Sequence, residues 1–228
     1  MDNPSNEFKE NSINFILENN FASYRSYIVE NSQNAVRLPA GTCLTREGQP
    51  IQSMFFLLKG TVKVYTINIS GYIRLLGYHK ENTIFAMDGL RDRHPATVTT
   101  EAVTDIEVIK LSFPDIQRLC MKNSDFCSDL LLYYGDVLRL MCFDAESQSI
   151  NNVITRLANF ICLFMQSDAY QQTGYILMSQ QNLASAIKAS RVQVARVCAR
   201  LKQEGIIKVG KGKLIIADEK RIRQYSQF

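Results

Sequence analysis

The chain has 228 residues, a formal net charge of +4 and a hydrophobic content of 46%. This length suits one large domain or two ordinary ones, and no apolar run approaches the roughly 20 residues of a membrane span. The opening segment Met-Asp-Asn-Pro-Ser-Asn-Glu lacks the basic and apolar regions of a signal peptide. We therefore expect a cytoplasmic globular protein without a membrane partner.

The modest net charge conceals an uneven distribution along the chain. Residues 151–228 carry 12 Lys or Arg and 4 Asp or Glu, a net of +8, whereas residues 1–150 carry 14 and 18, a net of −4. A basic C-terminal third attracts the phosphates of nucleic acid without regard to sequence. Charge alone leaves a second interpretation open, which is a basic face that is merely solvated.

The six cysteines form no Cys-x-x-Cys pair, which argues against a zinc site or a thioredoxin-like motif. Most of them stand in apolar helical surroundings, where a reduced thiol behaves as a small hydrophobic side chain. The alternative is a thiol redox sensor that uses Cys120, Cys127 or Cys142, with Cys120 and Cys127 as the nearest pair.

Residues 11–30 include Ile13, Phe15, Ile16 and Leu17, and this amphipathic stretch predicts a short leading helix. From Ala35 to Leu111 the pattern changes to short β-branched and aromatic runs separated by turn signals. Several short strands at regular spacing predict a β-sandwich or a small barrel. The expected strands include residues 54–58, 62–66, 72–78 and 104–111.

Pro114 and Asp115 open a helical region. An apolar three-four rhythm in this region predicts a helix that pairs with a second copy of the chain. The predicted dimer seam consists of Cys127, Leu130, Tyr134, Val137 and Met141. A second row, Leu131, Leu138 and Cys142, lies beside it, so one row can meet a partner while the other packs on the barrel. The alternative is one broad stripe that faces the core.

Residues 152–166 predict an apolar helix, residues 167–174 a loop and residues 175–178 a short strand. Residues 179–205 then predict two helices joined by a tight turn, with an apolar face of Val194, Val197, Cys198 and Leu201 on the second. This arrangement presents side chains to the major groove of DNA. The side chains expected to face bases are Arg191, Val192, Gln193 and Arg196. Arg pairs with guanine, Gln with adenine, and Val packs on the methyl group of thymine.

Other side chains of this region are placed to contact phosphates, which set the register without reading the sequence. Residues 206–216 predict a hairpin wing with a basic, glycine-rich turn. The predicted phosphate contacts are Ser179, Gln180, Ser190, Arg200, Lys211 and Lys213.

Two stretches together resemble the Crp/Fnr family of bacterial transcription regulators. These are Glu47-Gly48 followed by residues 54–64, like the family's barrel strands, and residues 190–196, like its recognition helix. The resemblance implies an α+β fold with three parts. A double-stranded β-helix, a jelly-roll-like effector barrel, spans residues 1–112, a long dimerisation helix spans 113–150, and a winged helix-turn-helix spans 151–228. It also implies an effector-responsive homodimer on a near-palindromic site of double-stranded DNA, with RNA polymerase as a partner if the protein is an activator.

The chain departs from the cyclic-nucleotide-binding members of that family. Those members grip the ribose with a Gly-Glu pair and the phosphate with an Arg-Ser pair, but residues 84–90 and 94–98 here contain no phosphate-binding arginine at that place. A buried phosphate without a cation faces a desolvation cost of several kcal/mol. Met141 and Cys142 also replace the polar pair that meets the adenine. These departures argue against cyclic AMP as the effector.

The other cofactor classes of the family find no support either. An iron–sulfur oxygen sensor needs an N-terminal cysteine cluster, and no cysteine precedes Cys43. Haem regulators place a histidine close to Asp88, whereas His79 and His94 are both predicted to be surface or loop histidines. We therefore assign no cofactor.

In the predicted recognition helix, Val192 stands where many family members carry Glu. In this respect the chain is similar to some regulators of organohalide respiration, which sense chlorinated aromatic acids. This likeness predicts an apolar or aromatic effector in a pocket lined by Tyr78, Met87, Asp88, Tyr134, Leu138, Met141 and Cys142.

An enzyme is the remaining alternative, because the predicted barrel resembles cupin-like metal enzymes in outline. Such enzymes need clustered His and carboxylate ligands. The chain has two histidines on different segments and no Ser-His-Asp or Cys-His arrangement. We therefore expect a protein that is not an enzyme.

Overall fold

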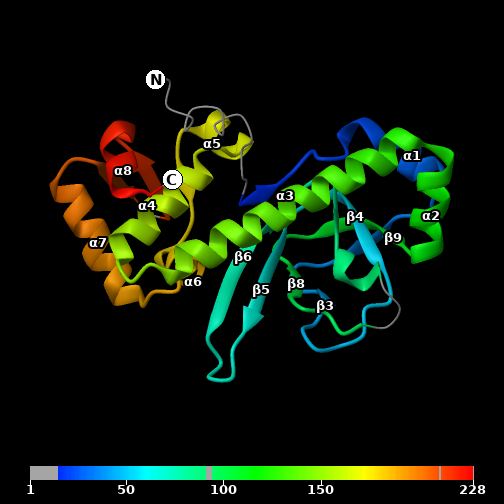
Figure 1. The fold of residues 1–228 in the computed structure, drawn as a ribbon, viewed down its shortest axis with the longest axis horizontal. Coiled ribbons are helices and arrows are strands. Elements are labelled where there is room, and N and C mark those ends of the chain that lie inside the picture. The colour runs from blue at the N-terminus through cyan, green and yellow to red at the C-terminus, as the bar shows by residue number, and fades with distance from the viewer. Residues whose placement is uncertain (1–14, 91–93, 211, 228) are drawn as a thin grey trace, which may run out of the picture. The chain divides into compact units, whose positions relative to one another are not determined.

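The computed structural model describes residues 15–90, 94–210 and 212–227 of the chain. The chain divides into two compact units. One, the roll unit, is Ile16–Gly135, and the other, the C-terminal unit, is Asp136–Phe228 together with Met1–Phe15. The long helix α3 (Ser124–Ser149) begins in the roll unit and ends in the C-terminal unit (Figure 1). The three-part division that we expect from the sequence stays a prediction.

The described part of the roll unit holds two β-sheets. The first has the strand order β1-β6-β5-β8-β3, and the second has the order β2-β9-β4-β7. Neighbouring strands are antiparallel, apart from the β1–β6 pair. The bounds are β1 Ile16–Leu17, β2 Val36–Leu38, β3 Cys43–Thr45, β4 Met54–Lys59, β5 Val62–Ile67, β6 Ile73–His79, β7 Thr83–Phe85, β8 Thr99–Ala102 and β9 Ile106–Leu111.

The core of the roll unit lies between the two sheets. Val62 of β5 and Ala102 of β8 pack there with Leu57 of β4 and Val108 of β9. The run Met54–Leu58 is buried at every position, as expected for a central strand covered on both sides. Strands β4, β5, β6 and β9 confirm the four runs expected from the sequence, with ends shifted by one or two residues.

The leading helix predicted for residues 11–30 is wrong over its first half. Ile16 and Leu17 form β1, which pairs in parallel with Tyr78 and His79 of β6. Phe15, Ile16 and Leu17 are all buried, and three consecutive buried side chains suit a strand with contacts on both faces better than a one-sided helix. The helical part comes later, as the 3₁₀ turn Ala22–Tyr24 and α1 (Arg25–Glu30). Ile13 lies outside the described residues.

Helix α2 (Phe113–Lys122) follows β9 and starts at a reciprocal cap. The backbone amide of Asp115 donates to the Ser112 hydroxyl, and the Ser112 amide donates to the Asp115 carboxylate at 2.9 Å. Pro114 in the first turn adds a fixed φ that suits a helix start. The sequence expectation of a helix at this point is confirmed.

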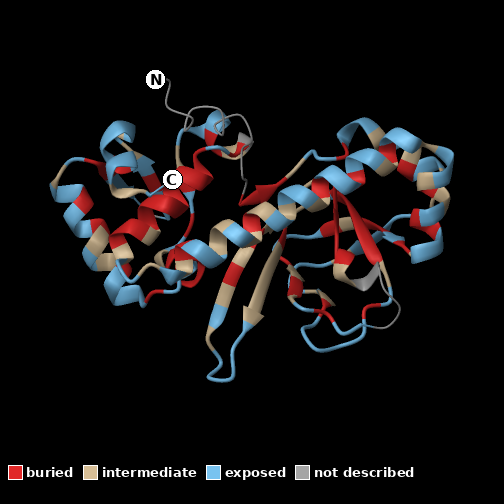
Figure 2. Ribbon diagram, viewed as in Figure 1, coloured by how far each residue is buried: buried red, intermediate tan, exposed pale blue. Residues whose placement is uncertain are grey.

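The C-terminal unit is a helical domain with a small sheet. Its elements are α4 (Val153–Phe164), α5 (Asp168–Thr173), β10 (Ile176–Leu177), α6 (Gln180–Ala186), α7 (Arg191–Gln203), β11 (Ile207–Gly210), β12 (Lys213–Ile216) and α8 (Glu219–Tyr225). The sheet has the order β10-β12-β11. Ten of the twelve residues of α4 are buried, so this helix is the centre of the unit (Figure 2).

Two features of this unit were not predicted from the sequence. The expected loop at 167–174 contains α5, which the Ser167 hydroxyl caps and Gly174 ends with a φ of +70°. The side chain of Asn159 is fully buried, and its oxygen accepts from the Ser226 hydroxyl at 2.8 Å and from the Gln227 amide at 3.0 Å. Asn159 thereby fastens the C-terminal end of the chain to α4.

Candidate nucleic-acid interface and effector region

Helices α6 and α7 form a helix-turn-helix with both starts capped by serine. The Asn182 amide donates to the Ser179 hydroxyl at 3.1 Å, and the Gln193 amide donates to the Ser190 hydroxyl at 3.2 Å. Between the helices, Lys188 has a φ of +51°, which reverses the chain in a short turn. The two caps expected from the sequence are confirmed.

Helix α7 buries one face and exposes the other. Val194, Cys198 and Leu201 are buried, as the apolar spacing predicts. Arg191 and Arg196 are exposed, and Val192 is 60% exposed. A large apolar side chain left in water at the first turn of such a helix suits contact with a base methyl group.

Two of the predicted contact residues are already engaged within the unit. The side-chain oxygen of Gln193 accepts from the Ser190 amide at 2.8 Å, so reading a base with this oxygen requires the cap to open. Arg200 donates to Glu204 at 2.8 Å and lies over the ring of Tyr225. Its i,i+4 spacing to Glu204 favours this pair over a free cation aimed at phosphate.

The wing is the antiparallel hairpin of β11 and β12, which β10 extends through the pairing of Ile176 with Leu214. The Lys213 ammonium lies 4.2 Å from the centroid of the Tyr175 ring, a cation–π contact beside the turn of the hairpin, where Lys213 pairs with Gly210. Lys211, the other predicted wing contact, lies outside the described residues.

A surface hollow of about 380 Å³ lies where the start of α6, the start of α7 and the wing meet. Four residues predicted from the sequence to contact DNA line this hollow. They are Ser179, Gln180, Arg191 and Lys213. Residues as far apart in sequence as 179 and 213 are therefore brought to one surface that carries two cations.

In the roll unit, a turn between β7 and the 3₁₀ segment Met87–Leu90 is held by helix α3. The Tyr133 phenol donates to the carbonyl of Ile84 at 3.0 Å, and the Tyr134 phenol donates to the carbonyl of Met87 at 2.9 Å. Between these carbonyls, Ala86 has a φ of +62°, which an L residue rarely adopts. Two adjacent tyrosines thus clamp a strained turn.

Asp88 fastens the same turn on its other side. Its carboxylate accepts from both the amide and the hydroxyl of Thr97, each at 2.8 Å. Burial, and the nearby Asp88 carboxylate, raise the pKa of Tyr134, so its phenol stays protonated as a donor. Thr97 and Tyr133 were missed in the sequence because no local pattern links either of them to residues 84–88.

The predicted effector pocket is divided between the two units. Tyr78, Met87, Asp88 and Tyr134 belong to the roll unit, whereas Leu138, Met141 and Cys142 belong to the C-terminal unit. Within the roll unit, Met87, Asp88 and Tyr134 meet at the clamped turn. The pocket as a whole stays a prediction.

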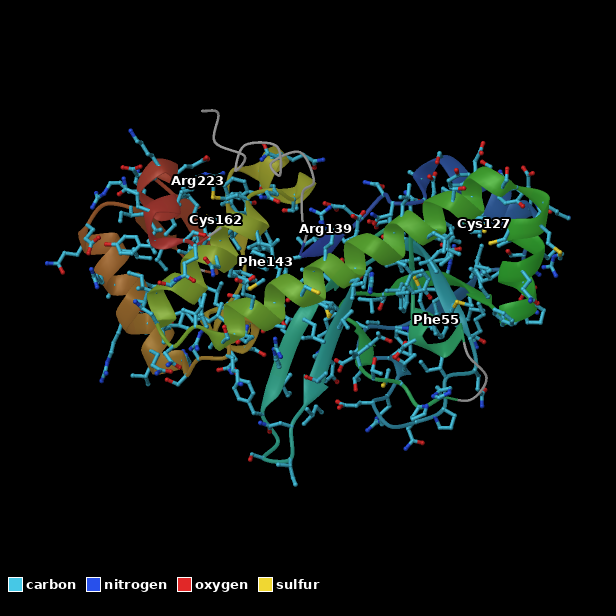
Figure 3. All side chains as sticks on the ribbon, in the orientation of Figure 1. Phe55, Cys127, Arg139, Phe143, Cys162 and Arg223 are labelled. Carbon is cyan, nitrogen blue, oxygen red and sulfur yellow. The ribbon has the colours of Figure 1, made fainter. Side chains whose placement is uncertain are left out.

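The two histidines differ in their surroundings. His94 is exposed, as predicted, but the prediction for His79 is wrong because its side chain is only 8% exposed. Its ring stacks on Phe85 with centroids 5.1 Å apart, and Phe85 in turn stacks on Phe55, which Figure 3 labels. Burial lowers the pKa of His79 to about 3, and its Nδ1 has no hydrogen-bond partner among the described residues.

The two apolar rows of α3 differ in exposure, and the more exposed row is not the one predicted to form the dimer seam. Leu130 is buried and Tyr134 is bonded to Met87, so these two members of the predicted seam are corrected to packing within the protomer. Cys127, Val137 and Met141 are partly exposed. The second row is the exposed one, with Leu131 at 68% and Leu138 at 64%.

No helix among the described residues is both long and apolar enough to cross a membrane. In the same part of the chain, no three His, Cys, Asp or Glu side chains come together in a group able to hold a metal ion.

Comparison with family models gives two matches that together cover most of the chain. Residues 35–123 match the cyclic nucleotide-binding domain, and residues 155–225 match the Crp-like helix-turn-helix domain. The chain is a member of the Crp/Fnr family. The regulator is accordingly a DNA-binding transcription factor with an effector-binding domain, and it is not an enzyme.

Two curated relatives match this chain over most of their own length. The cAMP-activated global transcriptional regulator Vfr of Pseudomonas aeruginosa is 24% identical to the regulator over 187 residues, or 79% of this chain and 87% of Vfr. The transcriptional activator Anr of the same species is 22% identical over 174 residues, or 75% and 71% of the two chains.

Solved structures confirm the fold as a β-roll, a long helix and a helix-turn-helix domain. CLP of Xanthomonas campestris superposes with a TM-score of 0.72 at 17% identity and covers 84% of this chain and 98% of its own. CprK in complex with OCPA superposes with a TM-score of 0.71 at 20% identity and covers 92% and 97%.

Proposed function

We propose that the regulator is an effector-gated homodimer that binds a near-palindromic site on double-stranded DNA in the cytoplasm. The hollow shared by α6, α7 and the wing carries this proposal. Its two cations, Arg191 and Lys213, supply phosphate attraction, and the Ser179 and Gln180 side chains at the start of α6 supply further polar contacts. A second copy supplies the second half-site reader, and RNA polymerase is the further partner that the family implies.

Within α7 the proposed base readers are Arg196 and Val192, with Arg191 beside them. Arg196 is exposed and forms no salt bridge in the described part of the chain, so its guanidinium is available for the two acceptors on guanine. Gln193 can read a base with its side-chain oxygen only after the bond from the Ser190 amide to that oxygen is broken.

The proposed dimer contact is the exposed row of α3, namely Leu131, Leu138 and Cys142. Leu131 and Leu138 stand seven residues apart, which places them on one side of a helix for pairing with a second helix. Substituting Leu138 with Lys should convert a dimer into a monomer in analytical ultracentrifugation. Ile69 of the hairpin between β5 and β6 is also fully exposed, and Ile69→Lys is the matched control that should stay dimeric.

The proposed effector is apolar or aromatic and lacks a phosphate. Residues 94–98 hold no arginine where the family's phosphate-binding arginine is expected, and the Asp88 carboxylate already accepts from the amide and hydroxyl of Thr97. A second anion at these donors would lie beside a carboxylate without a compensating cation, which is unfavourable. The clamped turn at Met87 and Tyr134 links this region to α3.

Fluorescence anisotropy with DNA fragments selected by the protein itself tests the function. We expect specific binding that strengthens or weakens when a chlorinated aromatic acid is added and does not respond to cyclic AMP. Binding that is unchanged by every aromatic compound but altered by cyclic AMP would contradict the proposed effector class. An absence of selected sequences would contradict the base-reading assignment.

A further inference from the structure

The roll unit has a surface hollow of about 380 Å³ that is separate from the clamped turn. It lies where β3 of the first sheet, the loop of residues 46–53, and strands β4 and β9 of the second sheet meet. We call it the β3–loop hollow. Its lining includes none of Met87, Asp88 and Tyr134, so it is not the predicted effector pocket.

The inner wall of the β3–loop hollow is apolar. Ile51 and Phe55 line it, and each is 7% exposed because it also belongs to the core between the two sheets. Leu44, another lining residue, packs against the same core. Phe55, labelled in Figure 3, stacks on Phe85 with centroids 5.4 Å apart. The wall is therefore fixed by the packing behind it and offers a preformed apolar surface.

Lys110 reaches the hollow from the core-facing side of β9. In the pairing of β9 with β4, Lys110 lies opposite Phe55. Residues directly opposite each other share one face of a sheet, and Phe55 faces the core. Ile106 and Val108, the alternate residues before Lys110, belong to the core as well. This apolar row thus ends in an exposed lysine at the hollow.

The β3–loop hollow carries an excess of positive charge. Among the described residues, the charged ones that line it are Arg46 and Lys110, and neither forms a salt bridge. Glu47 follows Arg46 directly, but its carboxylate accepts from the Ile67 amide at 3.1 Å on the hairpin of β5 and β6. The two cations therefore stand beside an apolar wall without a lining carboxylate.

A second hollow of the roll unit shows the opposite balance. It measures about 450 Å³ and is lined by two cations, Arg37 and Lys59, and by two carboxylates, Asp105 and Glu107. Arg37 pairs with Glu107 at 3.8 Å. Because its charges cancel within the protein, this hollow attracts no anion. It supplies a comparison for the β3–loop hollow.

We propose that the β3–loop hollow binds a small organic carboxylate. Its carboxylate meets Arg46 and Lys110, and its apolar part lies on Ile51 and Phe55. The guanidinium offers two parallel donors that match a carboxylate, and the lysine adds a second positive charge. The volume falls within the roughly 300–1,000 Å³ of small-molecule sites, which are mostly apolar with a few placed polar groups.

Backbone hydrogen bonds connect this hollow to the clamped turn. The Ala96 amide donates to the Gln49 carbonyl at 2.8 Å, and the Gly48 amide donates to the Ala96 carbonyl at 2.8 Å. The next residue, Thr97, donates twice to the Asp88 carboxylate. A ligand that shifts the loop at Gln49 therefore acts on the segment that fastens the clamped turn.

Cys43 provides a reporter at the hollow. It lines the hollow, is exposed, and its thiol donates to the Thr45 carbonyl at 3.2 Å. Trypsin cleaves after Arg37 and Arg46, so Cys43 falls in the peptide of residues 38–46. The other exposed cysteine, Cys142, falls in residues 140–156. Mass spectrometry of these peptides gives the rate at which iodoacetamide alkylates each thiol in the full-length protein.

Benzoate is the probe for the site. We expect the alkylation of Cys43 to slow and reach a plateau as benzoate is added. Uncharged benzyl alcohol, and sodium chloride at the same concentration, should give no such protection. An unchanged rate at Cys43 would overturn the proposal, and so would protection of Cys142 without protection of Cys43, which would place benzoate in the predicted effector pocket. Equal protection by inorganic phosphate would show that the apolar wall has no role.

Substitutions of the two cations test their part in the site. Lys110→Gln and Arg46→Gln should each raise the benzoate concentration for half-protection by about tenfold or more, as expected when a charge-assisted hydrogen bond is lost. In Arg46→Gln the reporter peptide becomes residues 38–59. Arg37→Gln removes an exposed arginine of the second hollow and should keep the parent value. A parent value in Lys110→Gln would overturn the carboxylate assignment.

The effect on DNA binding is a separate consequence that rests on the proposed function. We expect benzoate to change the DNA affinity by about fivefold or more, the lower range of usual coupling between sites, and Lys110→Gln to remove this response. If the protein binds no DNA, the proposed function fails while the protection of Cys43 still decides the site. If Lys110→Gln keeps the full response, the regulatory consequence is wrong.

Discussion

The Tyr134 phenol on helix α3 donates a hydrogen bond to the carbonyl of Met87 at 2.9 Å, one residue before the carboxylate that Thr97 holds. This bond and the bond from the Tyr133 phenol to the Ile84 carbonyl join α3 to the turn of the roll unit on both sides of Ala86, a residue with a positive φ. A ligand that moves this turn must also break or shift its bond to α3. The contact is thus a direct mechanical link from the roll to the long helix.

Removing the Tyr134 hydroxyl tests this link. Tyr134→Phe should lower the free energy of unfolding by about 1 kcal/mol, because it leaves a partly buried carbonyl without its donor. Urea denaturation followed by circular dichroism measures the change. Tyr175→Phe removes a hydroxyl while keeping the ring that contacts Lys213, and it should be nearly neutral. An equal loss of unfolding free energy in the two variants would mean that the Tyr134 bond does not stabilise the turn.

The buried His79 predicts a pH dependence of stability. Because its pKa is lowered to about 3 in the folded protein, the folded state stays neutral while the unfolded chain takes up a proton below its ordinary pKa of 6.5. The stability associated with a neutral His79 is complete above pH 6.5 and falls as the pH drops toward 3. The maximum slope from this one group is about 1.4 kcal/mol per pH unit.

The matched variants for this dependence are His79→Phe and His94→Gln. Phe keeps a ring against Phe85 but cannot titrate, so the unfolding free energy of His79→Phe should change less between pH 6.5 and 4.5 than that of the parent. His94 is exposed, and its substitution should leave the parent slope intact. A parent-like slope in His79→Phe would mean that other groups cause the acid sensitivity.

Measurements of DNA affinity should distinguish the role of Arg196 from that of Lys213. Arg196→Ala should cost roughly 1–3 kcal/mol at one base position and relax the preference there. Lys213→Gln should weaken all sequences alike and reduce the dependence of affinity on salt. Binding measured on a panel of single-base variants at two salt concentrations distinguishes these patterns. A uniform loss for Arg196→Ala would show that it contacts phosphate and not a base.

Gly60 is a point where the backbone tolerates no side chain. Its φ is +98°, and a Cβ there would lie 2.6 Å from the Asp105 carbonyl oxygen. Gly60→Ala should therefore destabilise the protein by more than the roughly 1–2 kcal/mol of the left-handed conformation alone. Gly41 has a similar φ of +83° with open space around its Cβ, and Gly41→Ala should show only the conformational cost in thermal melts.

Local chemistry made much of the C-terminal unit predictable. Ser179, Ser190 and Gly205 mark helix ends because caps depend on residues three or four positions apart. The short β-branched and aromatic runs at 54–58, 62–66 and 72–78, separated by turn signals, likewise predicted strands from local patterning. The basic excess of residues 151–228 pointed to nucleic acid through charge alone, which does not depend on how the chain folds.

Contacts between residues far apart in sequence were decided only by the tertiary structure. The strand at Ile16–Leu17 exists because β6 offers it a parallel edge, and no local spacing announces a partner some sixty residues away. The same reason explains why His79 is a buried ring on Phe85, why Leu130 packs inward while Leu131 stays in water, and why Thr97 meets Asp88. Helical periodicity gave the rows of α3, but which row is covered depends on what packs against the helix, because the same apolar side chain is buried or exposed according to its neighbours.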